Sequence, residues 1–154
     1  MDKRYEVYCL VDPHFYDSTS QVGEQPRDFE LGHSPVPEGW TASDLEDWRV
    51  HRPINAELPA QGWKVHVSAC LGNAERVLAA VADYCLNKRV AFKFLRSPDA
   101  LLLANAKYAD RGSSGKFITM YPADEARLEA MLIELGKVLD GSPGPYVLSD
   151  LRWG

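Results

Sequence analysis

From residue 63 onward, segments with a hydrophobic period of two alternate with segments whose apolar residues recur every three or four positions. The stretch GWKVHVSA shows the short period, since Trp63, Val65 and Val67 fall on one side of it. Lys64 and His66 fall on the other side. A period of two is that of a half-buried strand, and a period near 3.6 is that of an amphipathic helix. The alternation predicts an α+β fold, in which helices pack on a mixed or antiparallel sheet.

The predicted elements divide the chain into two parts. Residues 1–62 contain six of the ten prolines, which remove hydrogen-bond donors and favour short strands and ordered loops. Residues 63–154 contain clearer helices, one predicted to begin after Asn73 and another after Ser97, at Pro98. We expect strands at residues 4–10, 47–53, 62–69, 90–96, 115–121 and 146–153, and helices at residues 72–89, 97–108 and 122–140.

The length of the chain, 154 residues, is enough for one domain with a substantial core. We therefore treat residues 1–154 as a single domain, with a strand-and-loop part at 1–62 and a strand-helix part at 63–154. The chain stops at Arg152-Trp153-Gly154, in strand-like sequence without a turn or a polar tail. Domains seldom end in this way, so we expect it to be cut from a longer protein.

Charge and cysteine content argue against several classes of function. The net charge is −5, with a balance of −7 in residues 1–62 and +2 in the remainder, which disfavours nucleic-acid binding but allows a small basic pocket. Cys9, Cys70 and Cys85 are widely spaced, which predicts neither a disulfide framework nor a metal site. No apolar run approaches the roughly 18 residues of a membrane span. We expect a reduced, cytoplasmic protein without a membrane partner, metal or cofactor.

Five basic residues lie on or next to predicted strands, where such residues are unusual. They are Lys64, His66, Lys93, Lys116 and Arg152. Taken singly, each is most simply a solvated or structural residue. Together they suggest a basic pocket on one face of the sheet.

The loop KYADRGSSGK, residues 107–116, combines glycines with Lys107, Arg111 and Lys116. Glycines let backbone N–H groups approach an anion, and the cations supply charge. A polar helix-to-strand connection explains the same composition equally well, and the spacing is not that of a nucleotide-binding loop. We assign His14, His33 and His51 a structural role, because no residue of matching spacing accompanies them.

Four blocks of the sequence resemble the amino-terminal lyase domain of class III lanthipeptide synthetases. They are MDKRYEVYCLVDPHFYD, GWKVHVSA, NAKYADRGSSGKFITMYPAD and GPYVLSDLRWG, so the resemblance runs the whole length of the chain. In that family, kinase-like and cyclase-like domains follow in the same polypeptide. The lyase domain is similar to the phosphothreonine lyases that bacterial pathogens inject into host cells. The resemblance implies a phospholyase-effector-like fold.

The resemblance also implies a reaction, the β-elimination of phosphate from phosphoserine or phosphothreonine in a precursor peptide, without metal or cofactor. It identifies His66 of the Lys64-Val65-His66 stretch as the acid, Lys93 as the base, and Lys64 and Arg152 as phosphate ligands. The injected lyases have a second lysine where this chain has Ala91. The remaining contacts to phosphate or substrate are assigned to Lys116, Arg111, Lys107 and Tyr121.

Physical chemistry supports the same assignments. Abstraction of the weakly acidic α-proton needs a strong base, and the neutral amine of a lysine becomes available when like charges and burial lower its pKa. Lys93, flanked by Phe92 and Phe94 and expected to face Lys64 and an arginine, would have both influences. His66, with an ordinary pKa of about 6.5, can protonate the leaving phosphate.

Two other functions are compatible with parts of the sequence. A non-catalytic module that binds the leader segment of the precursor peptide is the alternative, because the acidic, proline-rich first part could offer a strand edge or a groove. A phosphohydrolase is disfavoured, because the sequence has neither an Asp/His metal cluster nor a Cys-x5-Arg loop. The expected partners are the leader and core of a phosphorylated precursor peptide and the kinase and cyclase domains of the same polypeptide.

Overall fold

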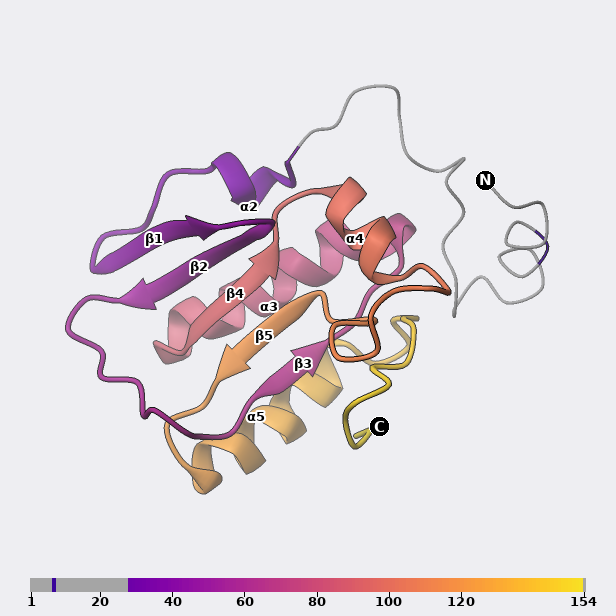
Figure 1. Ribbon diagram of the computed structural model, residues 1–154. Coiled ribbons are helices and arrows are strands. Elements are labelled where there is room, and N and C mark those ends of the chain that lie inside the picture. The colour runs from indigo at the N-terminus through magenta and orange to yellow at the C-terminus, as the bar shows by residue number, and fades with distance from the viewer. Residues whose placement is uncertain (1–6, 8–27, 154) are drawn as a thin grey trace.

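The computed structural model describes Val7 and residues 28–153, which form an antiparallel five-stranded sheet with helices packed on it (Figure 1). The strand order is β1-β2-β4-β5-β3. The elements are α2 (Glu30–His33), β1 (Trp40–Leu45), β2 (Trp48–Pro53), β3 (Val65–Val67), η2 (Leu71–Asn73), α3 (Ala74–Lys88), β4 (Ala91–Leu95), α4 (Pro98–Ala104), β5 (Ile118–Tyr121) and α5 (Glu125–Val138). The α+β prediction is confirmed, and the sheet takes the antiparallel form.

One face of the sheet packs against α3 and α5, which lie behind the strands in Figure 1. Alternate residues of β4 and β5 supply its fully buried side chains, namely Phe92, Phe94, Ile118 and Met120. Val77 and Val81 of α3 and Met131 of α5 belong to the same core cluster. Burying each of these side chains stabilises the fold by roughly 1.5–3 kcal/mol. The period-two and period-3.6 patterns therefore define the two surfaces that meet in the core.

His51 of β2 is part of this core, with 1% of its surface exposed. Its ring stacks on Phe92, with centroids 5.1 Å apart, and on Phe94, with centroids 5.6 Å apart. The pKa of His51 is lowered to about 4, chiefly by burial and also by the positive charge of Arg49, which outweighs the opposite effect of Asp44. His51 is thus a neutral structural histidine at pH 7, in agreement with the sequence prediction.

Side-chain hydrogen bonds define the starts of two helices, and the one at Ser97 was predicted from the sequence. The Ser97 hydroxyl accepts from the Ala100 N–H, and Pro98 occupies the first turn of α4. The Asp124 carboxylate accepts from the Arg127 N–H at the start of α5. Asn73 precedes α3 as expected, but its side chain makes no cap to that helix.

Several predicted boundaries differ from the structure. The strand predicted at 146–153 is wrong: those residues form a coil with a turn. The strand predicted at 62–69 is shortened to β3, and Trp63, expected to face the core, is 53% exposed because it precedes the paired residues. The helix predicted at 97–108 ends at Ala104. The strand predicted at 4–10 lies outside the described residues, except for the helical Val7.

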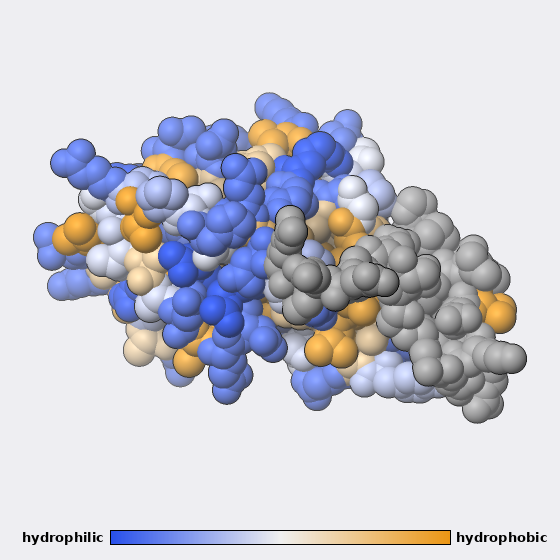
Figure 2. Space-filling model, turned by 90° about the horizontal axis from the view of Figure 1, so that it is seen from above, coloured by the Kyte–Doolittle hydropathy of each residue, from blue (hydrophilic) through white to orange (hydrophobic). Residues whose placement is uncertain are grey.

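The surface seen from above is mostly hydrophilic where the structure describes it, with hydrophobic residues singly or in small groups (Figure 2). Apolar side chains scattered in this way are normal for a folded domain. Within residues 28–153, no helix combines the length and apolar character needed to cross a bilayer.

Candidate active site

A row of polar residues crosses the sheet face opposite the helical core. Lys93 of β4 pairs with Thr119 of β5, and Thr119 pairs with His66 of β3. Directly paired residues of an antiparallel sheet point to the same face, so these three side chains share it. Because neighbouring strands are about 4.8 Å apart, the Cα atoms of Lys93 and His66 are separated by roughly 10 Å. Lys93 and His66 are thus separated by one strand on the same face.

Lys93 stands on the central strand and is half-buried. Its Nζ lies 4.3 Å from the centroid of the Trp48 ring, on the neighbouring strand β2. Burial lowers the pKa of Lys93, and the positive charges of Lys64 and Lys116 lower it further. The attraction between the ammonium group and the Trp48 ring opposes this shift, since it favours the charged form. The net effect is a lysine that yields its proton more readily than an ordinary surface lysine.

His66 lies at the other end of the row, with its side chain 10% exposed. Its Nδ1 forms a hydrogen bond with Oδ2 of Asp150. The other carboxylate oxygen lies 3.9 Å from Nζ of Lys116 and accepts a hydrogen bond of 2.8 Å from the Ser149 hydroxyl. The pKa of His66 lies below its ordinary value: burial lowers it, and so do the positive charges of Lys116 and Lys64, whereas the hydrogen bond and negative charge of Asp150 raise it.

The segment that carries Asp150 is held against the sheet by close backbone packing. Gly144 lies so near Ser68 that a Cβ added to it would be 2.6 Å from the serine Oγ and 2.9 Å from its carbonyl oxygen. Asn73 Nδ2 donates to the carbonyl of Pro143 at 2.8 Å. These contacts fix the segment to the end of β3 and the start of α3.

A second glycine fixes the segment from the side of the 105–117 loop. Gly115 has a φ of +73°, and a Cβ added to it would lie 2.7 Å from the carbonyl oxygen of Tyr146. The chain then turns, with the Asp150 N–H donating to the carbonyl of Val147 at 3.2 Å. Backbone packing on both sides thus brings Asp150 to His66, 84 residues away in sequence.

The structure brings together four of the predicted site residues, namely Lys93, His66, Lys64 and Lys116. Lys93 was expected to face Lys64 and an arginine, but the two charges that lower its pKa come from Lys64 and Lys116. Among the three loop cations considered for the missing second lysine, Lys116 is the one that acts on the pKa of Lys93.

The other predicted residues lie around this cluster. Tyr121 follows Thr119 by two positions on β5, so it shares the same face, and burial raises its pKa. Arg152 lies in the C-terminal coil, with its guanidinium carbon 4.6 Å from the centroid of the Tyr146 ring. Arg111 is exposed in the loop that precedes Lys116. Their roles in substrate binding stay predictions.

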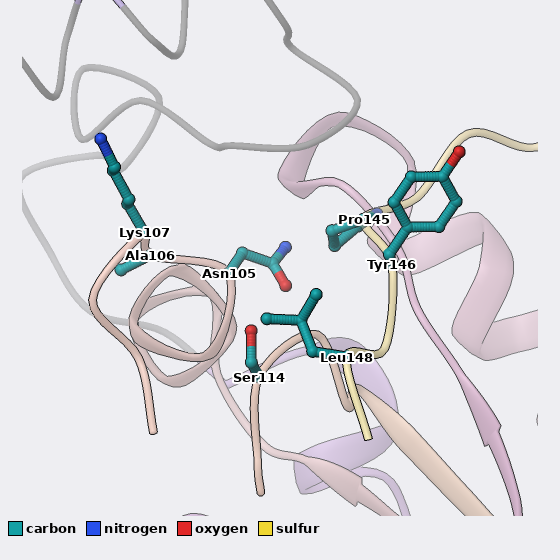
Figure 3. A pocket seen from close by; sticks show the side chains of 7 residues that line it. All are labelled: Asn105, Ala106, Lys107, Ser114, Pro145, Tyr146 and Leu148. Atoms are coloured by element: carbon teal, nitrogen blue, oxygen red, sulfur yellow. The ribbon is translucent and has the colours of Figure 1, made fainter. Parts of the chain in front are cut away.

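Lys107 borders a small recess between the same loop and the C-terminal segment (Figure 3). Asn105, Ser114 and Leu148 meet in this recess, whereas the Lys107 side chain points away from them. Its volume of about 40 Å³ has room for only a few water molecules. None of the residues of the row on the sheet lines this recess, and the role of Lys107 in substrate binding stays a prediction.

Sequence reasoning missed Thr119 and Asp150. The period-two pattern of KFITMY puts Thr119 on the other side of the strand from Ile118 and Met120, so the face it occupies was predictable. Its cross-strand partners, His66 and Lys93, were not. No local signal marks Asp150, which lies in a segment predicted as a strand. Among the described residues, His, Cys, Asp and Glu form no group of three or more that could hold a metal ion.

Comparisons with known proteins agree with this fold. Residues 28–154 match the family model described as RamC, N-terminal domain. The chain is 51% identical over 158 residues to the probable SapB synthase of Streptomyces coelicolor, of which it spans 17%. It shares a fold with the type III effector and phosphothreonine lyase OspF of Shigella flexneri, with a TM-score of 0.62, 13% identity and coverage of 97% of this chain and 84% of that one. The chain therefore belongs to the RamC amino-terminal domain family, the lyase-like domain of lanthipeptide synthetases that its sequence resembles.

Proposed function

We propose that this domain eliminates phosphate from phosphoserine and phosphothreonine residues of a lanthipeptide precursor. The neutral amine of Lys93 takes the α-proton, and the electrons of that C–H bond form the Cα=Cβ double bond. The Cβ–O bond breaks, and the phosphate leaves with a proton from His66. The products are dehydroalanine or dehydrobutyrine and hydrogen phosphate.

The observation that carries the proposal is the cross-strand row that ends in a lysine of lowered pKa and a histidine. Burial and the charges of Lys64 and Lys116 lower the pKa of Lys93, which raises the fraction of neutral base at a given pH. The same two cations offer charge-assisted contacts to a phosphate dianion and stabilise its charge as it leaves. The proposed base and acid share one face of the sheet, and the cations that act on the pKa of both would supply the anion site.

The remaining expectations extend the proposal to the whole protein. The chain spans 17% of the length of the SapB synthase relative. We propose that kinase and cyclase domains of the same polypeptide act before and after this step, in the cytoplasm. Arg152, Arg111, Lys107 and Tyr121 would contact the phosphate or the peptide, from positions around the row.

Mass measurement tests the reaction directly. A peptide containing phosphothreonine is incubated with the domain, without metal or nucleotide, and the product mass is recorded. Elimination leaves a product one water lighter than hydrolysis does, and pure binding leaves the mass unchanged. Lys93→Ala should nearly abolish elimination while fluorescence anisotropy still detects peptide binding, because the base is lost but the phosphate ligands remain.

The matched control is Lys88→Ala. Lys88 ends α3, behind the sheet, where its Nζ lies 3.5 Å from Glu134. It carries the same charge as Lys93 but lies away from the row, so its replacement should leave turnover unchanged. Near-normal turnover of the Lys93 variant would show that another group is the base.

A second candidate function is binding of the leader segment of the precursor. Strand β1 pairs with β2, and no second strand pairs with it in the described part of the chain. An exposed strand edge can accept an extended peptide as an additional strand. Leader binding is compatible with catalysis in the same domain. A domain that binds the peptide but leaves its mass unchanged would have the binding function without the lyase function.

A further inference from the structure

Asp150 is the acidic side chain that meets the row, and it contacts the proposed acid directly. Its Oδ2 forms a hydrogen bond with Nδ1 of His66, and its Oδ1 lies 3.9 Å from Nζ of Lys116. The side chains of His66 and Asp150 are 10% and 29% exposed, so solvent only partly screens the pair. The resemblance and the comparisons assign no role to this carboxylate.

An imidazole ring has two nitrogens, and the partner of one determines what the other can do. A carboxylate at Nδ1 accepts the proton of that nitrogen and fixes both the tautomer and the orientation of the ring. Nε2 is then the nitrogen that faces the substrate. We propose that Asp150 is a positioning residue for the acid His66, which it holds with Nε2 directed at the leaving phosphate and stabilises in its protonated form. This inference rests on the proposed lyase function and deepens it.

The charges around His66 explain why such a partner is needed. Burial, Lys116 and Lys64 all lower the pKa of His66, and the hydrogen bond and negative charge of Asp150 raise it. Lys93 lies two strands away on the same face. The cations that make Lys93 a better base thus make His66 a poorer proton donor. Asp150 offsets this effect at His66.

The carboxylate is itself held in the ionised form. Burial raises the pKa of Asp150, but the hydrogen bonds from His66 and Ser149 and the positive charges of His66 and Lys116 lower it by more. Asp150 is therefore negatively charged at neutral pH. The close packing of Gly144 and Gly115 fixes the backbone segment that carries Asp150, so the backbone itself holds this carboxylate beside His66.

The kinetic consequence follows from the two ordinary pKa values, about 10.4 for lysine and about 6.5 for histidine. The active form has a neutral Lys93 and a protonated His66, which is a minority form as long as the lysine has the higher pKa. On the plateau of the pH–rate profile, the fraction of enzyme in this active form depends on the difference between the two pKa values. The acid limb of the profile is set by the pKa of His66. Loss of Asp150 should therefore move the acid limb to lower pH and lower the plateau.

The test is Asp150→Asn, which retains the size of the side chain and removes its charge. With a phosphothreonine peptide, we expect kcat to fall roughly ten- to hundredfold, less than the full value of general acid catalysis. KM should stay constant or fall, because a carboxylate beside the phosphate site repels the substrate. Asp150→Glu should recover part of the rate. Asp140→Asn, an exposed residue just after α5, makes the same change of charge and should leave the profile unchanged.

NMR titration of the His66 ring measures the pairing without any substrate. The pKa of His66 should be lower in Asp150→Asn than in the wild-type chain. An unchanged His66 titration in an active enzyme, or an acid limb that does not move, would overturn this inference alone. Absence of elimination by the wild-type chain would overturn the proposed function, and with it the catalytic role of Asp150.

Discussion

Replacement of Gly115 by alanine tests whether backbone packing positions the C-terminal segment. Gly115 has a φ of +73°, and its Cβ would lie 2.7 Å from the Tyr146 carbonyl oxygen. Gly141 is a matched control, because its φ is +72° and an added Cβ there meets nothing within 4 Å. The left-handed conformation costs about 1–2 kcal/mol at either position. The close contact at Gly115 adds about 1–3 kcal/mol of strain, unless the Tyr146 segment moves away.

Urea unfolding and the elimination assay together measure both outcomes. If the segment stays in place, the free energy of unfolding of Gly115→Ala should fall by about 1–3 kcal/mol more than that of Gly141→Ala. If the segment moves instead, Asp150 leaves His66, and the variant should lose turnover with a smaller loss of stability. Equal stability and equal turnover of the two variants would refute the reasoning that this packing positions the carboxylate.

Two further predictions concern charge. Lys64→Met removes a positive charge that lowers the pKa of Lys93, so that pKa should rise and the alkaline limb of the pH–rate profile should move to higher pH. An unmoved limb would show that Lys64 does not act on the base. The pKa of His51 is about 4 in the folded chain, below the ordinary value of about 6.5 expected in the unfolded chain. Keeping His51 neutral therefore contributes about 3 kcal/mol to the free energy of unfolding above pH 6.5, and this contribution is lost as the pH falls toward 4. Urea unfolding should show a smaller acid loss in His51→Phe than in the wild-type chain, and equal losses would contradict this.

Local hydrophobic patterns predicted the strands and helices that bury one face in the core, but they did not predict which strands pair. Phe92 and Phe94 alternate with Lys93 in both the sequence and the structure, so the strand and its polar side were predictable. Tyr146 and Leu148 show the same alternation, yet they lie in a coil, because a strand also needs a hydrogen-bonded neighbour that the sequence does not reveal.

The site was predictable only where it depends on the side of a single strand. Lys93 and His66 could be assigned to the polar faces of their strands. That Thr119 joins them depends on the register of β4, β5 and β3, which pairs residues far apart in sequence. Asp150 reaches His66 across 84 residues through the packing of two glycines, which no local pattern describes.

The positions of the two proposed catalytic strands imply different local stabilities for base and acid. Lys93 belongs to the central strand, paired on both sides, whereas His66 belongs to a three-residue strand for which the described chain provides pairing with β5 alone. Short edge strands open at a lower free energy than central ones, and their amide protons exchange with solvent sooner. The acid side of the site can therefore open and close while the base side stays folded, so mild denaturant should remove proton donation before it removes the base.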